Sequence, residues 1–252
     1  MIQTHQLCLH YADTVVLDNI NVELRTSGVT SIIGPNGAGK SSLLGLLSRL
    51  QQPTSGQVLF DGTNIQTIDS ALLATKLAIL RQENHIISRL SVQDLVSFGR
   101  FPYHQGRPTP ADFVHINQAI DLLELNDFKS RFINELSGGQ RQRAFIAMVL
   151  AQQTDYLLLD EPLNNLDMKH SANIMKTLRI AADELKKSII LVIHDINFAA
   201  SYSDEIIAMK NGTIMYQDTP ANIMRDDMLS NLYDMPLKVE IINEQPVCLY
   251  YL

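Results

Sequence analysis

One stretch of nine residues constrains this chain more than any other. Residues 34–42 read G-P-N-G-A-G-K-S-S, and a short apolar run, Val29 to Ile33, directly precedes them. The pattern G-x-x-x-x-G-K-S between a buried strand and a helix lets successive backbone N–H groups point into one concavity. The leucine-rich segment 43–50 then begins a helix whose positive end faces the same point. The sequence therefore predicts a strand, a phosphate-binding loop and a helix.

Lys40 and Ser41 would supply the chemistry of this loop. We expect Lys40 to reach the β- and γ-phosphates of a nucleoside triphosphate, and the Ser41 hydroxyl to ligate the Mg²⁺ that bridges them. The alternative is a glycine-rich turn with a chance lysine. At average composition the four fixed positions coincide in a chain of this length in about one case per hundred, so the phosphate-binding interpretation is favoured.

Length and composition indicate one large domain, or a core with a smaller appended part. Its interior is large enough to be stable without disulfide bonds or a structural metal. The two cysteines, Cys8 and Cys248, lie at opposite ends of the sequence, which is typical of a reducing compartment rather than of a disulfide framework. There is no window of eighteen apolar residues and no basic segment like that of a signal peptide near the N-terminus. We expect a soluble, cytosolic protein.

The distribution of charge argues against nucleic acid as a main partner. The net charge is −7; residues 1–150 carry 12 basic and 12 acidic side chains, and residues 151–252 carry 8 basic and 15 acidic ones. A protein that grips a DNA backbone or an anionic bilayer usually presents a basic face.

Polar residues follow several apolar runs at the point where a strand is expected to end. Residues 155–162 read D-Y-L-L-L-D-E-P, a run typical of a central parallel strand that ends in two adjacent carboxylates, Asp160 and Glu161, on opposite sides. Gln82 and His194 end two other predicted strands. Beside a phosphate-binding loop, such strand ends place one carboxylate near Mg²⁺ and another where it can orient a water. Acidic residues that simply stop a strand are the alternative for Asp160 and Glu161, and a structural role is the alternative for His194.

A second possible anion nest begins at Leu136, where L-S-G-G-Q precedes a helix that extends to about residue 152. Before it, Ser91 and Asp94 have capping-box spacing, and the Gly-, Pro- and aromatic-rich loop 101–110 separates two helices. That loop is either a small local core or a docking surface. Tyr11, between the first two strands, either stacks on a nucleotide base or is ordinary packing.

The remaining elements are expected from periodicity and turn residues. In the first part of the chain we expect antiparallel strands within 1–27, an edge strand at 57–60, and a helix and strand within 71–80. Further along we expect helices at 111–125 and 168–185, the second capped by residues 164–167, and a strand at 188–193. The C-terminal part should contain a hairpin at 205–216 about Asn211-Gly212, a helical stretch at 218–234 and a hairpin at 236–252 around residues 244–246.

The order of these motifs resembles the nucleotide-binding subunit of ATP-binding cassette (ABC) transporters over about residues 2–220. Residues 97–103 and 163–170 look like the versions of two loops found in the iron–siderophore branch of the importers, which also serves haem and cobalamin. The resemblance implies an α/β fold: a P-loop NTPase (ABC ATPase) core with a mixed, largely parallel sheet, an N-terminal antiparallel β-subdomain and a helical subdomain. It also implies one domain, with residues 1–90 and 153–235 as RecA-like core, 91–152 as helical subdomain and 236–252 as a hairpin extension.

The resemblance assigns roles to individual residues. Catalytic residues would be Lys40, Gln82, Glu161 and His194. ATP would be bound by Tyr11, Gly34, Pro35, Asn36, Gly37, Ala38, Gly39, Lys40, Ser41 and Ser42, and Mg²⁺ by Ser41, Gln82 and Asp160. The signature segment, Leu136, Ser137, Gly138, Gly139 and Gln140, would contact the ATP held by a second copy, and Asp167 would link the two sites. Ser42, often threonine in the family, is the only small departure.

The implied partners are a second copy of the chain, separately encoded integral membrane permease subunits and a substrate-binding protein, with no nucleic acid. The implied location is the cytoplasmic face of the inner membrane, reached through the permease, and the implied activity is ATP hydrolysis that powers import of an iron–siderophore complex. Import of haem or cobalamin is the alternative cargo. A soluble ABC ATPase that acts on DNA or ribosomes fits less well, because the chain lacks a coiled-coil insertion. A P-loop kinase is a further alternative, but it would leave residues 136–140 without a function.

Overall fold

The structure is a computed structural model that describes residues 1–82, 89–104 and 106–250. The parts of the predicted core, aromatic loop and terminal hairpin that fall on residues 83–88, 105 and 251–252 lie outside the described residues. Among the described residues, no helix is both long and apolar enough to cross a membrane.

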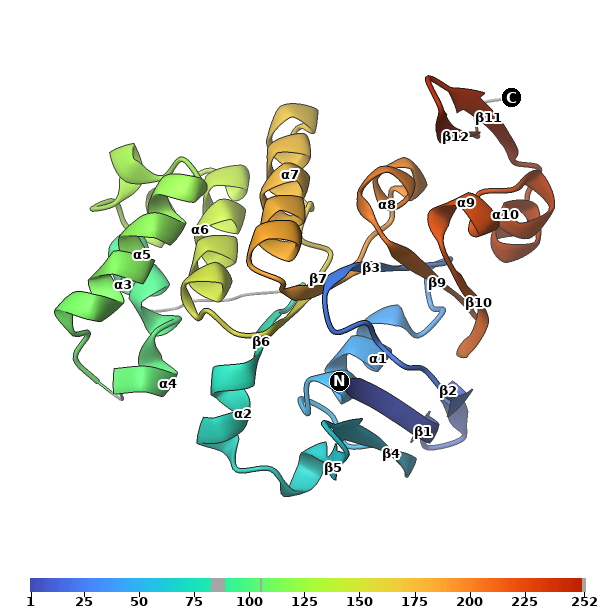
Figure 1. Ribbon diagram of the computed structural model, residues 1–252, viewed down its shortest axis with the longest axis horizontal. Coiled ribbons are helices and arrows are strands. Elements are labelled where there is room, and N and C mark those ends of the chain that lie inside the picture. The colour runs from blue at the N-terminus through green and yellow to red at the C-terminus, as the bar shows by residue number, and fades with distance from the viewer. Residues whose placement is uncertain (83–88, 105, 251–252) are drawn as a thin grey trace.

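The central sheet is parallel apart from one edge strand (Figure 1). Its order is β10 (Thr213–Asp218), β9 (Glu205–Lys210), β3 (Gly28–Ile33), β8 (Ser188–Val192), β7 (Tyr156–Asp160) and β6 (Leu77–Leu80). Every residue of β3, β7 and β8 is buried, as expected for strands covered on both faces. Because β3, β6, β7 and β8 run in one direction, their carboxyl ends meet at one edge of the sheet.

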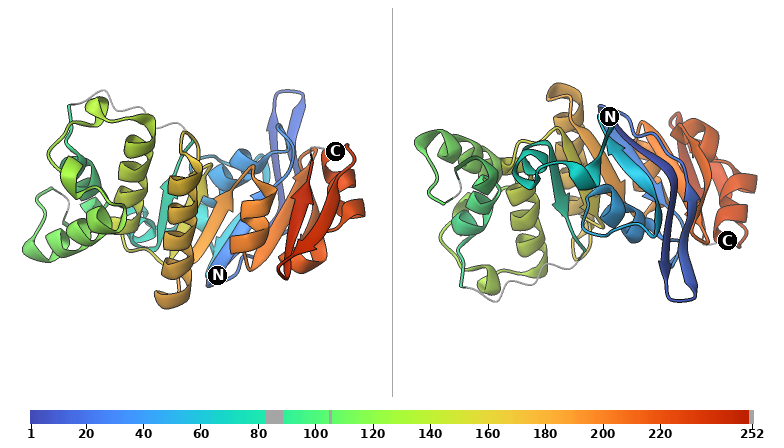
Figure 2. Two further views of the ribbon diagram at one scale, coloured as in Figure 1. Left: turned by 90° about the horizontal axis from the view of Figure 1, so that it is seen from above. Right: turned by 90° about the horizontal axis from the view of Figure 1, so that it is seen from below.

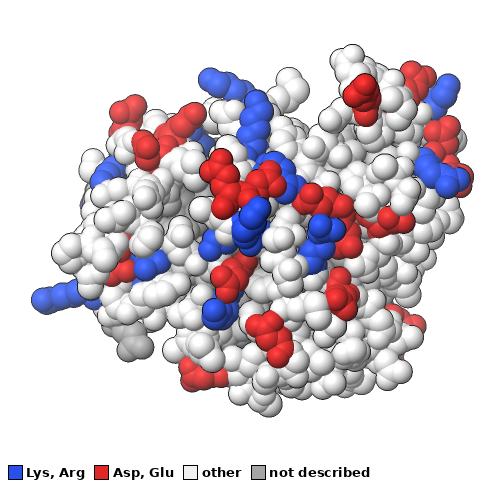
Figure 3. Space-filling view, in the orientation of Figure 1, with Lys and Arg blue, Asp and Glu red and all other residues white. Residues whose placement is uncertain are grey.

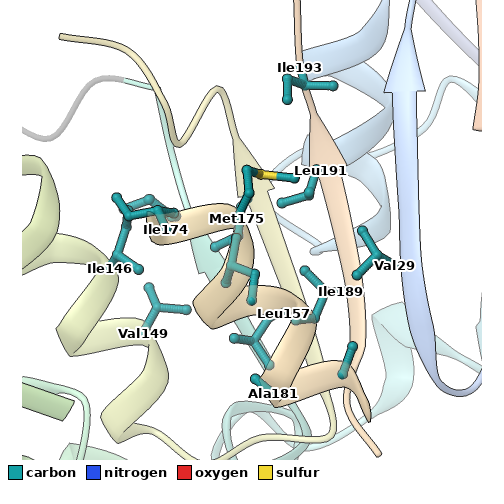
Figure 4. Packing of buried hydrophobic residues seen from close by; sticks show 14 of the residues in the cluster. Val29, Ile146, Val149, Leu157, Ile174, Met175, Ala181, Ile189, Leu191 and Ile193 are labelled. Atoms are coloured by element: carbon teal, nitrogen blue, oxygen red, sulfur yellow. The ribbon is translucent and has the colours of Figure 1, made fainter. Parts of the chain in front are cut away.

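Alternate residues of these strands face two different cores. Leu157 and Ile189 pack with α6 (Gly138–Ala151) and α7 (Met168–Glu184), as Figure 4 shows. Their neighbours Leu158 and Ile190 pack instead with the leucines of α1 (Lys40–Leu47) and with the second sheet. Strand residues that alternate between faces therefore build the three-layer arrangement expected for an α/β fold.

The second sheet is antiparallel, as predicted for the N-terminal segment. Its order is β2 (Thr14–Ile20), β1 (Ile2–Tyr11), β4 (Ser55–Phe60) and β5 (Thr63–Asn64). The expectation of an edge strand at 57–60 was wrong, because the short β5 covers the outer side of β4.

The second of the strands expected within 1–27, β2, ends at Ile20, and residues 22–24 continue beside β1 through backbone hydrogen bonds from the Thr4 N–H to the Val22 carbonyl and from the Leu24 N–H to the Ile2 carbonyl. The Thr4 hydroxyl donates to the Ile20 carbonyl and accepts the Val22 N–H, so a side chain takes over part of the pairing. Val22 remains buried, which shows why the apolar alternation extends past the strand.

The helical region contains α3 (Val92–Phe98), α4 (Phe101–His104), α5 (Pro110–Leu122), α6 and the short 3₁₀ helices η2 (Asn126–Phe128) and η3 (Ile133–Glu135). The capping box of Ser91 and Asp94 is confirmed. The helix expected at 111–125 ends at Leu122, since Glu124 adopts a left-handed conformation with φ of 53°.

Three further helices connect or cover the sheets. They are η1 (Ile65–Thr67), α2 (Ser70–Lys76) and α8 (Ile196–Tyr202). The C-terminal part begins with two helices, α9 (Pro220–Ile223) and α10 (Asp226–Tyr233), where one helical stretch was expected. Arg225, with φ of −136°, interrupts the stretch.

Both predicted hairpins are present. Asn211 and Gly212 form the turn between β9 and β10, with φ of 49° and 76°. The terminal hairpin of β11 (Lys238–Ile242) and β12 (Gln245–Leu249) turns at residues 243–244, slightly earlier than expected. Asn197 of α8 holds β12 through two hydrogen bonds with the backbone of Cys248. Figure 2 shows the helical region and this hairpin at opposite ends of the central sheet.

Candidate nucleotide-binding site

The predicted phosphate-binding loop connects β3 to α1, and two of its glycines are required because atoms of other segments come very close to them. A Cβ on Gly34, whose φ is 146°, would lie 2.0 Å from the Met209 carbonyl oxygen. A Cβ on Gly39, the N-cap of α1 with φ of 95°, would lie 2.6 Å from a methyl carbon of Leu17. Only glycine fits either position without displacing its neighbours.

Lys40 extends back into the loop. Its side chain is only 6% exposed, and its Nζ donates to the carbonyl oxygens of Gly34 at 2.8 Å and of Pro35 at 2.9 Å. Burial lowers the pKa of the ammonium, while the charges of Glu161 and Asp160 act in the opposite direction. The ammonium is therefore held at the concave side of the loop, where phosphate oxygens would enter.

Ser41 and Asp160 meet across the gap between α1 and β7. The Ser41 hydroxyl donates to Asp160 Oδ1 at 2.9 Å. Burial raises the pKa of Asp160, partly offset by the Ser41 hydrogen bond. A cavity of about 410 Å³ opens beside this pair and is also lined by Gln82. A hydroxyl, a carboxylate and an amide oxygen are the hard oxygen donors that suit Mg²⁺, which would also favour the ionised form of Asp160.

Glu161 lies at the centre of a second group, the glutamate cluster, with Gln82, Asn164 and His194. Its Oε2 accepts hydrogen bonds from Gln82 Nε2 at 2.7 Å and from Asn164 Nδ2 at 2.5 Å, and its Oε1 lies 2.6 Å from His194 Nε2. Burial raises the pKa of Glu161, but the hydrogen bonds from Asn164, His194 and Gln82 outweigh it, so the pKa lies below its usual range. Asp160 and Glu161 thus have separate partners, as their adjacent positions predict.

Two predicted site residues lie apart from this edge of the central sheet. Tyr11 is 55% exposed in the β1–β2 hairpin, whose second strand contacts the phosphate-binding loop through Leu17. Asp167 caps α7 by accepting the His170 N–H at 2.8 Å.

The signature segment forms the start of α6. Ser137 caps this helix in a capping box with Gln140. In the described part of the chain, no hydrogen bond or ion pair joins residues 136–140 or Asp167 to the phosphate-binding loop or to Glu161. The structure therefore brings together six predicted residues, and the signature segment is not among them. The six are Lys40, Ser41, Gln82, Asp160, Glu161 and His194.

Sequence reasoning missed Asn164 as a partner of Glu161. Residues 164–167 were predicted to cap the following helix and Asp167 to link two sites, but no role was assigned to the Asn164 side chain. The signal was present in the spacing, because a side chain three residues after a strand end returns toward that end when the chain makes a tight turn.

A phosphate-binding loop with strand-end carboxylates on a parallel sheet defines a P-loop nucleoside triphosphatase. The family profile described as "ABC transporter" matches residues 17–164, and the chain belongs to that family. It has the ABC ATPase fold.

Three similar proteins illustrate the relationship. The petrobactin import ATP-binding protein YclP of Bacillus subtilis (strain 168) is 50% identical over 251 residues, with 100% of each chain covered. The iron(3+)-hydroxamate import ATP-binding protein FhuC of the same organism is 38% identical over 256 residues, covering 99% of this chain and 94% of FhuC. The solved dimeric structure of the cassette MJ0796, in a post-hydrolysis state with ADP and Pi, is 28% identical with a TM-score of 0.80, covering 87% of this chain and 99% of that one. The resemblance inferred from the motifs is confirmed.

Proposed function

We propose that this chain is the ATP-hydrolysing subunit of an importer for an iron–siderophore complex and that it works on a separate membrane permease. The glutamate cluster is the observation that supports ATP hydrolysis. In it, a carboxylate at a strand end accepts hydrogen bonds from three donors and lies one residue from the Ser41–Asp160 pair. The cargo rests on the relatives, whose names describe import of petrobactin and of iron(3+)-hydroxamate.

In this proposal, the residues around the phosphate-binding loop divide the binding of Mg·ATP among them. The backbone N–H groups of residues 34–42 and the Lys40 ammonium bind the phosphates of ATP. Ser41, Asp160 and Gln82 would hold Mg²⁺, which neutralises charge on the β- and γ-phosphate oxygens when bound. Tyr11 would stack on the adenine ring.

Glu161 and His194 act on the attacking water and the γ-phosphate. The water oxygen bonds to the γ-phosphorus as the bond to the bridging oxygen breaks, the electron pair leaves with ADP, and Glu161 accepts the proton that the water releases. His194, hydrogen-bonded to Glu161, would contact the γ-phosphate. The depressed pKa of Glu161 keeps this acceptor ionised before ATP binds.

A homodimer would complete the site. Ser137, Gly138 and Gly139 begin α6 with backbone N–H groups that a helix N-terminus offers to an anion. In the proposal they close on the γ-phosphate held by a second copy, and Asp167 links the two sites. Dimeric solved structures of a similar cassette support this arrangement.

The division of the chain and its location follow the same proposal. Residues 1–90 and 153–235 would form the RecA-like core, 91–152 the helical subdomain and 236–252 an extension. The permease would dock near Gln82 and residues 99–110, which holds the chain at the cytoplasmic face of the membrane. A substrate-binding protein would deliver the cargo. The mixed charges on the face in Figure 3 offer no field of one sign to a nucleic acid.

Replacing Glu161 by glutamine tests the hydrolytic assignment. The amide keeps the size of the side chain and removes the proton acceptor, so we expect Glu161→Gln to bind ATP with near-normal affinity while its steady-state phosphate release falls by about 100-fold or more. Asp127→Ala, a change at an exposed aspartate of η2 in the helical region, is the control. Full turnover by Glu161→Gln would overturn the assignment.

Uptake measurements test the cargo. We expect cells or proteoliposomes containing the importer to accumulate a ferric siderophore and to lose this uptake with Glu161→Gln. Haem and cobalamin are compared side by side under the same conditions. Transport of either one without transport of a ferric siderophore would contradict the proposed cargo.

A further inference from the structure

The proposed reaction requires that one oxygen of Glu161 face the attacking water. The position of Asn164 allows its hydrogen bond to determine which of the two oxygens does so. A carboxylate oxygen has about two lone-pair sites. Oε2 of Glu161 has both filled, by Gln82 at 2.7 Å and by Asn164 at 2.5 Å. Oε1 has one partner, His194, and keeps one acceptor site free of the interactions described above.

The backbone holds Asn164 in this position. Glu161 has a left-handed conformation with φ of 49°, and the Asn164 N–H donates to the Glu161 carbonyl at 3.2 Å, which closes a tight turn. Asp167 then fixes the far end of the segment by capping α7. The Asn164 side chain is therefore directed to Glu161 by the chain on both sides of it.

The segment that carries Asn164 also lies against the signature segment of the same chain. A Cβ on Gly138 would stand 3.4 Å from Asn165 Cβ, and one on Gly139 would stand 3.3 Å from a Leu166 methyl carbon. The amide that contacts Glu161 is thus one residue away from the start of α6.

We propose that Asn164 is a positioning residue for hydrolysis: with Gln82 it occupies Oε2, so that Oε1, beside His194, is the oxygen that faces the water. This inference rests on the proposed ATPase function. In this inference Asn164 acts only through Glu161.

Three variants of Asn164 separate positioning from folding. Asn164→Ala removes the donor, Asn164→Asp keeps the shape but places a second carboxylate against Glu161, and Asn164→His keeps an N–H close to the position of the amide. The full-length chain is assayed for phosphate release with Mg·ATP, and its melting temperature is measured in parallel. Asn126→Ala, which removes an exposed asparagine bonded to Asp121, is the matched control.

Loss of a hydrogen bond to a charged acceptor predicts a fall in kcat of about 10-fold for Asn164→Ala, with KM for ATP changed less than about twofold. Asn164→Asp should lose more, and Asn164→His should recover most of the unmodified rate. Melting temperatures should match that of the Asn126→Ala control.

The results that overturn the inference are distinct from those that overturn the function. Unmodified kcat in both Asn164→Ala and Asn164→Asp would show that Asn164 does not position Glu161. Equal losses in all three variants together with lowered melting temperatures would show a role in folding alone. If the unmodified chain releases no phosphate, the proposed function itself fails, and the inference fails with it.

Discussion

At the scale of single residues, a buried ion pair connects two parts of the helical region. Arg100 Nε donates to Asp112 Oδ1 at 3.0 Å, and the two residues are 7% and 4% exposed. Burial raises the pKa of Asp112, but hydrogen bonds from the Thr109 N–H and hydroxyl and the charge of Arg100 outweigh it and lower the pKa to about 2. Arg100 also donates to the Ala151 carbonyl, so the pair connects α5 with the end of α6.

Removing the carboxylate should leave a buried charge without its partner. We expect Asp112→Ala to reduce the free energy of unfolding in urea by about 3 to 5 kcal/mol. Asp127→Ala, an exposed aspartate in the same region, serves as the control and should change it by less than about 0.5 kcal/mol. An Asp112→Ala chain as stable as the control would show that Arg100 is solvated or paired elsewhere.

The same pair predicts a dependence of stability on pH. Because the folded pKa of Asp112 is about 2 and its ordinary value is 3.8, its contribution is complete above the ordinary value and is lost as the pH falls from about 4 to about 2. Asp112→Asn should therefore lose less stability over this range than the unmodified chain. If the two proteins lost the same free energy of unfolding between pH 5 and pH 2, the assignment would be contradicted.

Some of these residues can be predicted from the sequence and others cannot, for physical reasons. Lys40, Ser41, Asp160 and Glu161 follow from spacing, because glycine positions and the ends of apolar strands fix where they lie. Asn164 was missed as a partner although its spacing from Glu161 was a signal, because the contact also needs the left-handed conformation of Glu161, which the residue type does not predict.

Asp112 illustrates a second limit of sequence reasoning. At the third position of a capped helix, an aspartate is usually exposed. Its buried partner Arg100 comes from a separate helix-end segment, and only the tertiary fold brings the two together.

At the scale of elements, α3 and α6 approach so closely that one position admits only glycine. Gly99 ends α3 with an ordinary φ of −57°, so conformational freedom is not the reason. A Cβ at this position would lie 2.1 Å from the Met148 carbonyl oxygen of α6. Because this neighbour is backbone, the two helices themselves would have to separate.

This contact predicts a large effect from one methyl group. Gly99→Ala should lower the free energy of unfolding by about 3 kcal/mol, at the upper end of overpacking costs. Gly106→Ala is the matched control, since a Cβ there meets nothing within 4 Å. Thermal unfolding of both variants checks the difference, and equal melting temperatures would show that α3 and α6 separate at little cost.

Element boundaries were less predictable than element types. Periodicity correctly predicted the strand at 188–193, which is a continuous apolar run, and the helix at 168–185, which is long and capped by Asp167. It misplaced the edge of the antiparallel sheet, since β5 has only two residues and no recognisable pattern. It also did not predict the end of β2 at Ile20, beyond which hydrogen bonds of the Thr4 hydroxyl join the backbone bonds between Thr4 and Val22 and between Ile2 and Leu24.

At the scale of the whole molecule, the two proposed halves of the ATP site belong to different parts of the chain. The phosphate-binding loop and the glutamate cluster lie at the edge of the central sheet, whereas the signature segment begins α6 in the helical region. If hydrolysis needs a loop from one copy and a signature from another, a defect in either half should be compensated by a second copy with the opposite defect.

Mixing two inactive variants tests this directly. Lys40→Ala removes the phosphate-binding ammonium, and Gly138→Asp places a negative charge where the signature would meet phosphate, at a helix N-terminus that tolerates an acidic residue. Each variant alone should hydrolyse ATP at a small fraction of the unmodified rate. In an equimolar mixture half of the dimers are mixed and each has one intact composite site, so about a quarter of the unmodified rate should return. Two separately prepared samples of the same variant, mixed together, are the control. No gain in the mixture of different variants would contradict an active site shared between two copies that hydrolyses ATP independently of the other site.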